Sequence, residues 1–478
     1  MRMLLLLLGR VTLLGGLALL LPMALALLWQ EPEAVFFALP AAVAIGVGAL
    51  LAWLGRHHKH QLSVREGAAF MVLVWLVFGC VGMLPYGLSG TLGWEMAFFE
   101  SVSAFTTTGA TCLPGPAPRT LIFWRSILEW LGGLNFIVLL VTVVPQVSGC
   151  FGMTLSAHQT IRFSPVLNRM YDTACQAAKI YAGVTLFSAV LYWLVGLDKF
   201  DSFTRAMVTM STSSMNSAAD FMQYDSLPLE LAGMLSMLLA SGNFLVYGKA
   251  VSRRNFREIW QDNELRTFLG LILAAGLLVA VHLWHSQVYD LADSLRFGFF
   301  QVISFASTSG FASASFGSWP DFDRYVLFIL VFVGGCIGST TGGLKVMRFA
   351  VLFKMAAAEM RRTLHPHMVI NIVMDGASVP MKIVGRILSF FFLYMLVFVL
   401  FVFIIALSGV TVMQAMGIAV GCLSSVGSAA VLYGFSDYAL LPAWTKLACC
   451  LLMVLGRLEI FSFLILLHTG IHPMRHKW

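Results

Sequence analysis

The stretch SAFTTTGAT, residues 103–111, places three consecutive threonines and a glycine directly after an apolar segment, and it carries no charge. Inside a membrane, backbone that is not helical is tolerated only where it is buried in protein or lines a water-filled cavity. A hydroxyl-rich break at this position therefore predicts irregular backbone along a polar path through the membrane.

The composition indicates a protein that crosses the membrane many times. Of the 478 residues, 59% are hydrophobic and 11% are charged, whereas a soluble domain has about 25% charged residues. A helix needs ~20 apolar residues to span the hydrocarbon core. The apolar runs are continuous rather than alternating, which favours helices over strands. We expect spans, among others, at residues 34–54, 68–88, 127–147, 265–283, 388–407 and 447–467.

The first 29 residues form a further apolar run. Because this run is long for a signal peptide and a second run begins at Ala34, we interpret it as a retained span rather than as a cleaved signal peptide. The eight cysteines include no CxxC pair, which favours buried thiols over a disulfide framework.

The net charge is +7, and the basic residues are concentrated in alternate connections between the expected spans. Because cytoplasmic connections carry the excess of Lys and Arg, we expect the basic connections and both termini in the cytoplasm. The basic residues form no single patch, so a nucleic acid is not an expected partner. The basic connections lie at residues 56–65, 162–179, 249–257 and 354–386, and those poor in Lys and Arg at 87–95, 196–202, 285–294 and 407–412.

Four apolar segments are too short to cross the membrane, at residues 96–104, 203–210, 295–306 and 413–423. Each is followed by a break rich in Ser and Thr and then by another apolar run. The breaks align as TTTG, STSS, STSG and SSVG, which end at Gly109, Ser214, Gly310 and Gly427. The repeated unit is therefore a span, a short helix that enters and returns, a hydroxyl-rich loop and a second span.

Four copies of this unit predict an all-α polytopic membrane protein with four pseudo-symmetric span–pore-helix–filter-loop–span repeats around one pore. The repeated unit is far longer than a solenoid repeat, which has roughly 20–50 residues. Its length therefore favours duplication of a pore unit. We place the repeats at residues 61–150, 151–258, 259–362 and 363–478, and an extra N-terminal helical hairpin at residues 1–60, outside the pore.

The four loops have the chemistry of an ion filter. A cation that leaves water needs oxygens in place of its hydration shell, and backbone carbonyls directed toward one axis supply them. Glycine accepts the positive φ that such a turn requires, hydroxyls add oxygens without charge, and the C-terminal end of the short helix is electronegative. One Thr/Ser/Gly loop alone is more often a linker, but four of them behind half-spans favour a filter.

Further motifs carry a resemblance to a known family: WLGGLNFIVLLVTVVP (130–145), SGNFLVYGKAVSRRNFREIWQDNELRTF (241–268), GGCIGSTTGGLKVMRF (334–349) and GRLEIFSFLIL (456–466). With these the chain resembles, over nearly its whole length, the Trk/Ktr/HKT superfamily of cation transporters, and within it the TrkH/TrkG-type potassium uptake subunits. The resemblance implies channel-like K⁺ uptake across the bacterial inner membrane. It implies K⁺ binding, chiefly by carbonyls, at Thr107, Thr108, Gly109, Thr212, Ser213, Ser214, Thr308, Ser309, Gly310, Ser425, Val426 and Gly427.

The resemblance also implies partners. Family members assemble as homodimers on a cytosolic ring of nucleotide-binding TrkA-type regulatory subunits, so we expect contacts at the basic connections 249–257 and 345–362. The chain has no GxGxxG motif, so a nucleotide would bind to that partner. We expect no organic cofactor in this chain, and no arrangement of residues indicates an enzyme.

The stretch GGCIGSTTGG, residues 334–343, has five glycines in ten residues within an expected span. Glycine at this density unwinds a helix. The stretch is not a nucleotide-binding loop, because Leu344 precedes Lys345 and no strand comes before it. The resemblance implies an intramembrane gate loop; the alternative is close helix packing. The implied gate residues are Gly334, Gly335, Gly338, Gly342 and Gly343, together with Arg457.

Arg457 lies in an apolar run. Charges inside a membrane are costly and usually functional, and the resemblance implies an arginine that projects toward the pore near the gate loop. The alternative is a structural ion pair with Glu459 or Glu129. Arg125 and Glu129 are four residues apart on one expected helix, so they can also pair with each other.

The second loop departs from the family pattern, which normally has glycine where this chain has Ser214. A non-glycine residue in a left-handed conformation costs roughly 1–2 kcal/mol, so we expect strain at Ser214 or a carbonyl turned away. In the plant HKT branch, serine at a filter position goes with Na⁺ preference, so a Na⁺-permeable or poorly selective transporter is one alternative. A register shift that puts Asn216 at this position is another.

Two further alternatives stay open. One is a secondary active solute transporter with broken helices at its binding site; the other is co-transport of H⁺ or Na⁺, as in a symporter. Three acidic residues near the loops, Glu100, Asp220 and Asp225, either enrich cations at the pore mouth or cap neighbouring backbone.

Overall fold

The structure, a computed structural model, describes residues 2–56, 64–115, 117–142, 166–214, 220–365, 372–374 and 377–458. These residues are almost entirely helical. The described residues also include two short antiparallel strands of two residues each, β1 (Val373–Met374) and β2 (Ala377–Ser378). Seven of the described helices are long and apolar enough to cross a membrane, and an eighth span results if one bent pair is counted as a single span.

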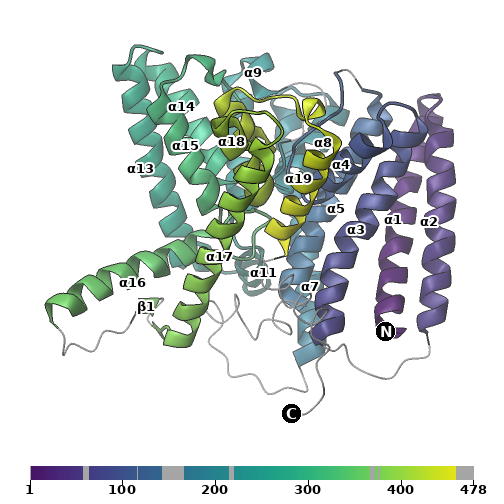
Figure 1. Ribbon diagram of the computed structural model, residues 1–478, viewed down its shortest axis with the longest axis horizontal. Helices are drawn as coiled ribbons and strands as arrows, with labels where there is room; N and C mark the ends of the chain where they lie inside the picture. Colours follow the sequence, from purple (N-terminus) through teal and green to yellow (C-terminus); the bar gives the residue numbers. More distant parts are fainter. Residues whose placement is uncertain are drawn as a thin grey trace.

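The chain begins with a helical hairpin of α1 (Arg2–Leu28) and α2 (Ala34–Gly55). The two helices approach closely because small residues line their contact: a Cβ at Gly16 would lie 2.9 Å from the backbone nitrogen of Ile45. Small residues at such contacts let helices pack by van der Waals attraction within lipid. The hairpin packs on the first repeat through α3 (Val64–Leu88) and α5 (Arg119–Thr142), as Figure 1 shows at its purple end.

Each repeat begins with a long helix that leads toward the end of the molecule holding the four loops. This end is the upper half of Figure 1, where α4, α8, α14 and α18 lie. The long helices are α3 (Val64–Leu88), α7 (Val166–Leu194), α13 (Asn263–His285) and α17 (Met381–Ala406). The short helices are α4 (Trp94–Phe105), α8 (Lys199–Met210), α14 (Leu291–Ala306) and α18 (Val412–Ser424).

The short helices confirm the expected half-spans. Each ends within one residue of the predicted boundary, at the start of a hydroxyl-rich break. Their starts are fixed by side-chain caps in three of the four cases: Asp198, Asp290 and Thr411 accept hydrogen bonds from backbone amides of the first turn. Such caps satisfy amides that have no partner within the helix.

The returning helices differ from one another. They are α5 (Arg119–Thr142), α10 (Leu227–Ser241), α15 (Asp321–Val333) and α19 (Ala443–Arg457). Helix α5 begins eight residues before the predicted span because Arg125 and Glu129 lie inside the protein rather than in lipid. Residues beyond 458, the second part of the span predicted at 447–467, lie outside the described residues.

Among the described residues, two returning helices are interrupted; the glycines of 334–343 predicted the interruption after α15, whereas the one after α10 was not expected. Helix α10 is followed after a 90° bend by α11 (Phe244–Arg253). Helix α15 is followed by the irregular residues 334–345 and then by α16 (Val346–Leu364), which in Figure 1 runs obliquely out from the bundle. Short elements complete the structure: α9 (Phe221–Tyr224), α12 (Arg257–Gln261), η1 (Phe316–Ser318), η2 (Gly427–Tyr433) and η3 (Tyr438–Leu440).

Candidate functional site

The four hydroxyl-rich loops, here called the filter loops, share one backbone conformation. In each, the second residue of the aligned tetrapeptide has a positive φ: 51° at Thr107, 54° at Thr212, 56° at Thr308 and 60° at Ser425. This conformation is unfavourable for Thr and Ser by roughly 1–2 kcal/mol. Its recurrence at equivalent positions confirms the sequence alignment and indicates a geometry that the surrounding structure imposes.

The same hydrogen bond closes each short helix. The amide after the left-handed residue donates to the carbonyl five residues earlier, which satisfies an orphan carbonyl of the last turn. The four bonds are Thr108 N to Ser103 O at 2.9 Å, Ser213 N to Val208 O at 3.1 Å, Ser309 N to Ser304 O at 3.0 Å and Val426 N to Gly421 O at 2.7 Å. The backbone therefore reverses direction in the same way four times.

The ends of the four filter loops meet. The amide of Gly427 donates to the carbonyl of Thr108 at 2.5 Å, and a Cβ at Gly427 would lie 2.7 Å from the carbonyl carbon of Gly109. A Cβ at Gly310 would lie 2.9 Å from Cβ of Ser214 and would also contact the Ser428 hydroxyl. The arrangement brings Gly109, Ser214, Gly310 and Gly427 into one cluster, as the alignment of the breaks predicts.

The strain expected at Ser214 is not found. Among the described residues, φ is positive at Gly109 (80°) and Gly310 (70°), but Ser214 is not among the non-glycine residues with positive φ. The left-handed residue of this loop is Thr212, two positions earlier. Ser214 thus fits without left-handed strain, and the alternative at Asn216 falls outside the described residues.

Replacing Ser214 with glycine is expected not to stabilise the protein. Glycine loses more backbone entropy on folding, so we expect a destabilisation of about 0.5–1 kcal/mol rather than a gain of that size from relieved strain. Thermal unfolding in detergent measures this difference. The same variant in liposomes reports, by the ratio of Rb⁺ to Na⁺ flux, whether the Ser214 hydroxyl contributes to ion selection. A higher melting temperature would contradict the absence of left-handed strain at Ser214.

Residues 334–343, the candidate gate loop, lie directly against the filter loops. The amide of Gly342 donates to the hydroxyl of Thr308 at 3.0 Å, and the hydroxyl of Thr340 donates to the carbonyl of Met210 at 2.9 Å. A Cβ at Gly342 would overlap the carbonyl oxygen of Ser424, so only glycine allows this approach. The unwinding expected from the five glycines is present, since α15 ends at Val333.

Buried polar groups hold the candidate gate loop in this unwound shape. Glu264 on α13 accepts the amide of Ile337 at 2.7 Å. The break between α10 and α11 supplies two more bonds: the carbonyl of Ser241 accepts the amide of Cys336 at 2.9 Å, and the amide of Phe244 donates to Gly338 at 3.2 Å. These bonds replace the helical ones that the loop lacks. Neither Glu264 nor the break at SGN (241–243) was expected to be part of the site.

Lys345 is a second residue that the sequence analysis placed elsewhere. It was expected to begin a basic cytoplasmic connection, but it is 4% exposed. Its ammonium donates to the hydroxyl of Thr341 at 2.8 Å and to the carbonyl of the same residue. Lys345 therefore stabilises the candidate gate loop by binding back to Thr341. The sequence feature that could have indicated this role is its position at the end of the glycine-rich stretch.

Arg457 joins the first filter loop to the candidate gate loop. Its Nε donates to the carbonyl of Thr106 at 2.8 Å and its Nη1 to the carbonyl of Thr340 at 2.7 Å, while Nη2 donates to the hydroxyl of Thr107. Arg457 has no ion pair with Glu129 or any other described carboxylate, and Glu459 lies outside the described residues. Among the described residues, the guanidinium is thus held by neutral oxygens and not by a carboxylate.

Arg457 and Lys345 lie against the same aromatic ring. The Arg457 guanidinium carbon lies 4.9 Å from the ring centroid of Phe136, and the Lys345 ammonium lies 5.4 Å from it. An aromatic face attracts cations at such distances. Two buried basic side chains therefore lie together beside the first filter loop and the candidate gate loop.

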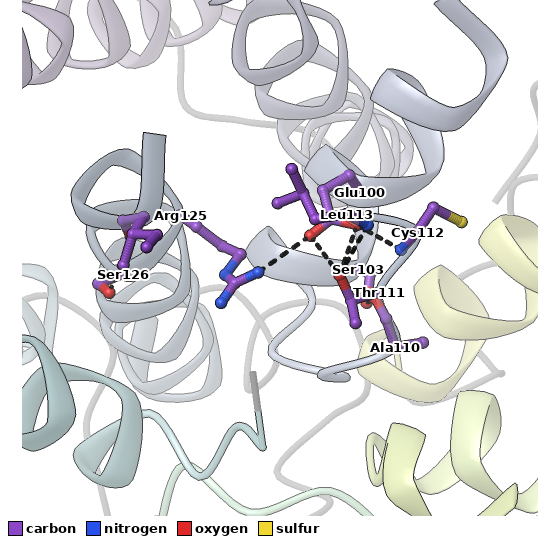
Figure 2. Close-up of polar contacts among 9 residues, drawn as sticks. Glu100, Ser103, Ala110, Thr111, Cys112, Leu113, Arg125 and Ser126 are labelled. Atoms are coloured by element: carbon purple, nitrogen blue, oxygen red, sulfur yellow. Dashed lines mark hydrogen bonds and ion pairs between the residues drawn. The ribbon is translucent and has the colours of Figure 1, made fainter. Parts of the chain in front are cut away.

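Of the acidic residues near the filter loops, Glu100 acts as a cap in this structure. Figure 2 shows its carboxylate on α4 between the loop that follows the filter and Arg125 on α5. It accepts the Cys112 amide at 2.8 Å and the Thr111 hydroxyl at 2.9 Å, and it lies 3.5 Å from Arg125. These contacts fix the first filter loop after it leaves the cluster.

The other two acidic residues are also committed to structure. Asp220 accepts the amides of Phe221 at 3.0 Å and Ala312 at 3.2 Å, which ties the second loop to the third. Asp225 lies 2.8 Å from Arg296, which also pairs with Glu230 at 2.7 Å. Capping is thus observed for Asp220, whereas Asp225 forms an ion pair with Arg296 and its side chain is largely exposed.

Comparison with known proteins places this architecture in a family. Residues 35–474 match the model of the TrkH family, described as cation transport proteins. The chain is 33% identical to the Trk system potassium uptake protein TrkH of Escherichia coli strain K12 and 30% identical to TrkG of that strain; the alignments cover 93% and 94% of this chain and 94% of each relative. It is similar to the crystal structure of the potassium transporter TrkH from Vibrio parahaemolyticus, with a TM-score of 0.88, 30% identity and 98% coverage of both chains.

These matches agree with the geometry of four half-spans, four filter loops and an unwound helix. They confirm the resemblance drawn from the sequence motifs and the expectation of an ion transporter rather than an enzyme. The chain belongs to the TrkH family of cation transport proteins.

Proposed function

We propose that this protein carries out channel-like K⁺ uptake across a bacterial inner membrane. The observation that carries the proposal is the meeting of four loops with the same backbone turn, at Gly109, Ser214, Gly310 and Gly427. Uncharged oxygens around one axis replace the hydration shell of a monovalent cation without trapping it. The named relatives are potassium uptake proteins.

Selection takes place, in this proposal, at the twelve filter residues named from the sequence. The alternative of a Na⁺-permeable transporter rests on one observation, the Ser214 side chain that lies against Gly310. A side chain there narrows the ring on one side, which favours a smaller ion. We favour K⁺ because the other three loops end in glycine and because the relatives are named for potassium.

The candidate gate loop and Arg457 control passage in the proposed mechanism. In the arrangement described here the guanidinium bonds to both the filter and the candidate gate loop. A cation that leaves the filter meets this charge. Opening requires the loop and Arg457 to move together, because Thr340 connects Arg457 to the second filter loop through Met210.

The remaining elements of the proposal concern assembly and orientation. We propose both termini in the cytoplasm, a homodimer, and a TrkA-type regulatory ring beneath it. The exposed basic residues Lys354, Arg361 and Arg362 of α16 and the connection 249–257 offer the contact surface. The repeat boundaries given from the sequence, with residues 1–60 outside the pore, complete the proposed organisation.

Uptake of K⁺ is directly testable. We expect the gene to restore growth at low K⁺ in a bacterial host that lacks its own uptake systems, provided that the host supplies a compatible regulatory subunit. Purified protein in liposomes loaded with K⁺ is expected to accumulate ⁸⁶Rb⁺ at least about tenfold above protein-free liposomes, since an outward K⁺ gradient drives Rb⁺ inward through a selective pathway. The TrkH of Vibrio parahaemolyticus serves as the positive control. Uptake by that control and none by this chain would overturn the proposal.

A further inference from the structure

One buried carboxylate next to the filter has no place in the function described so far. Glu129 on α5 has 0% exposure. Neither of its carboxylate oxygens has a hydrogen-bond partner among the described residues. A buried ionised carboxylate without partners is strongly unfavourable, so such a group holds a proton or lies beside a cation.

The position of Glu129 on α5 places it at the level of the second filter loop. A Cβ at Gly133, one helical turn further along α5, would lie 3.1 Å from Cα of Ser211, the first residue of that loop. One turn of α-helix advances about 5.4 Å, and the loop runs back in the same direction from Ser211 to Ser213. Glu129 and Ser213 are thus neighbours, and the Ser213 hydroxyl lies close enough to the Glu129 carboxylate to be a weak hydrogen-bond donor to it.

Ser213 is the second observation that points to a missing partner. Its side chain is 0% exposed, and its hydroxyl, like the carboxylate oxygens of Glu129, makes no hydrogen bond of normal geometry within the part of the chain that the structure describes. A buried hydroxyl normally finds a partner. The contact between the two groups falls outside normal hydrogen-bond geometry, so both keep unused hydrogen-bonding capacity beside the second filter loop.

The charges around Glu129 do not remove this imbalance. Arg125, one turn earlier on α5, lies 3.5 Å from Glu100, so one arginine faces two carboxylates. The other titratable groups that interact with Glu129 from packed helices are the phenols of Tyr86 on α3 and Tyr181 on α7. Neither phenol supplies a positive charge. Among the described residues, Glu100 and Glu129 thus share the charge of one neighbouring arginine.

We propose that Glu129 is ionised and is the counter-charge for the transported monovalent cation at the second filter loop, where it forms a cation-stabilising site together with Ser213. The inference rests on the proposed function and adds to it a residue that sets ion affinity. The second loop has Ser214 where the others have glycine. In this proposal, the Glu129 carboxylate gives the second loop an additional electrostatic attraction for the cation.

The test compares Glu129→Gln with the unchanged protein in ⁸⁶Rb⁺ uptake by proteoliposomes. Glutamine keeps the shape of the side chain and removes its charge. We expect the KM for Rb⁺ to rise about tenfold, because an uncompensated charge in a partly screened site changes cation affinity by about this factor. The maximal rate and the amount of folded protein are expected to stay within about twofold, whereas a purely structural role would lower these and leave KM unchanged.

Two further variants make the result specific. Asp323→Asn is the matched control, since Asp323 is equally buried on a returning helix but bonds to His282 at 2.8 Å, outside the filter; its KM is expected to equal that of the unchanged protein. Ser213→Ala keeps the loop carbonyl and removes the hydroxyl. If both side chains serve one site, the double variant with Glu129→Gln shows less than the product of the two single effects on KM.

The possible results distinguish a failure of the proposed K⁺ uptake from a failure of the proposed role of Glu129. If the unchanged protein does not transport Rb⁺, the proposed function fails. If it does and Glu129→Gln has the same KM, Glu129 is protonated and the inference is overturned. Should Glu129→Gln be too unstable to reconstitute, thermal unfolding of Ser213→Ala across a K⁺ titration decides instead: loss of the stabilisation by K⁺ supports the site, and an unchanged shift overturns it.

Discussion

Replacing Arg457 with glutamine is expected to increase Rb⁺ flux through proteoliposomes by roughly 30-fold in the absence of any regulatory partner. The guanidinium is held by Thr106, Thr107 and Thr340 and has no described carboxylate partner. A unit charge a few ångströms from the path of an ion contributes about 2 kcal/mol to the barrier, which corresponds to roughly 30-fold in rate. Glutamine removes the charge and also loosens the link between the first filter loop and the candidate gate loop.

The matched control for this prediction is Lys446→Gln. Lys446 is a buried cation on the same helix, α19, but it lies 3.3 Å from Glu95 and contacts neither the candidate gate loop nor Phe136. Its removal is expected to change flux by less than about threefold, as for an ion pair with one exposed partner. Equal fluxes for Arg457→Gln and the unchanged protein would show that Arg457 is structural and that another group closes the path.

Replacing Gly310 with alanine is expected to reduce Rb⁺ uptake by about tenfold to a hundredfold and to weaken selection against Na⁺. Gly310 has a φ of 70°, and a Cβ there would lie 2.9 Å from Cβ of Ser214. The left-handed conformation costs alanine roughly 1–2 kcal/mol, and overpacking costs about 1–3 kcal/mol more. We expect the loop to relieve the conformational strain and the overpacking by turning its carbonyls away from the axis. The dehydrated ion then has fewer oxygens to coordinate it.

Gly409→Ala is the control for the conformational strain of a positive φ in the absence of a steric clash with a filter loop. Gly409 has a φ of 90° in the turn before α18, and a Cβ added to it would meet nothing within 4 Å. Gly409→Ala therefore carries a similar conformational cost but disturbs no filter loop. We expect it to lower the melting temperature slightly and to leave the uptake rate and the ratio of Rb⁺ to Na⁺ flux unchanged. A comparable loss of uptake in both variants would attribute the Gly310 effect to stability alone.

The four half-spans and their loops were predictable because local composition encodes them. An apolar segment of about a dozen residues cannot cross a bilayer, and Thr, Ser and Gly directly after it mark where helical backbone stops. The short helices α4, α8, α14 and α18 therefore end where the sequence predicts, before Thr106, Ser211, Ser307 and Ser425. The positive φ expected at the last residue of each loop is confirmed at Gly109 and Gly310 but not at Ser214 or Gly427. The positive φ at the second residue of every loop was not predicted, because Thr and Ser rarely adopt it and the surrounding structure imposes it.

The sequence by itself determined what each segment can bury: the helical spans, the half-spans, the hydroxyl-rich loops and the unwinding of residues 334–343. Only the tertiary structure decided which buried polar groups meet, because those partners come from distant repeats: Glu264 with Ile337, Ser241 with Cys336, and Arg457 with Thr106 and Thr340. Hydrophobic burial depends on the composition of a segment and is readable along the chain. A hydrogen bond depends on the distance and direction of one specific partner, and these are fixed only when the four repeats pack around their common axis.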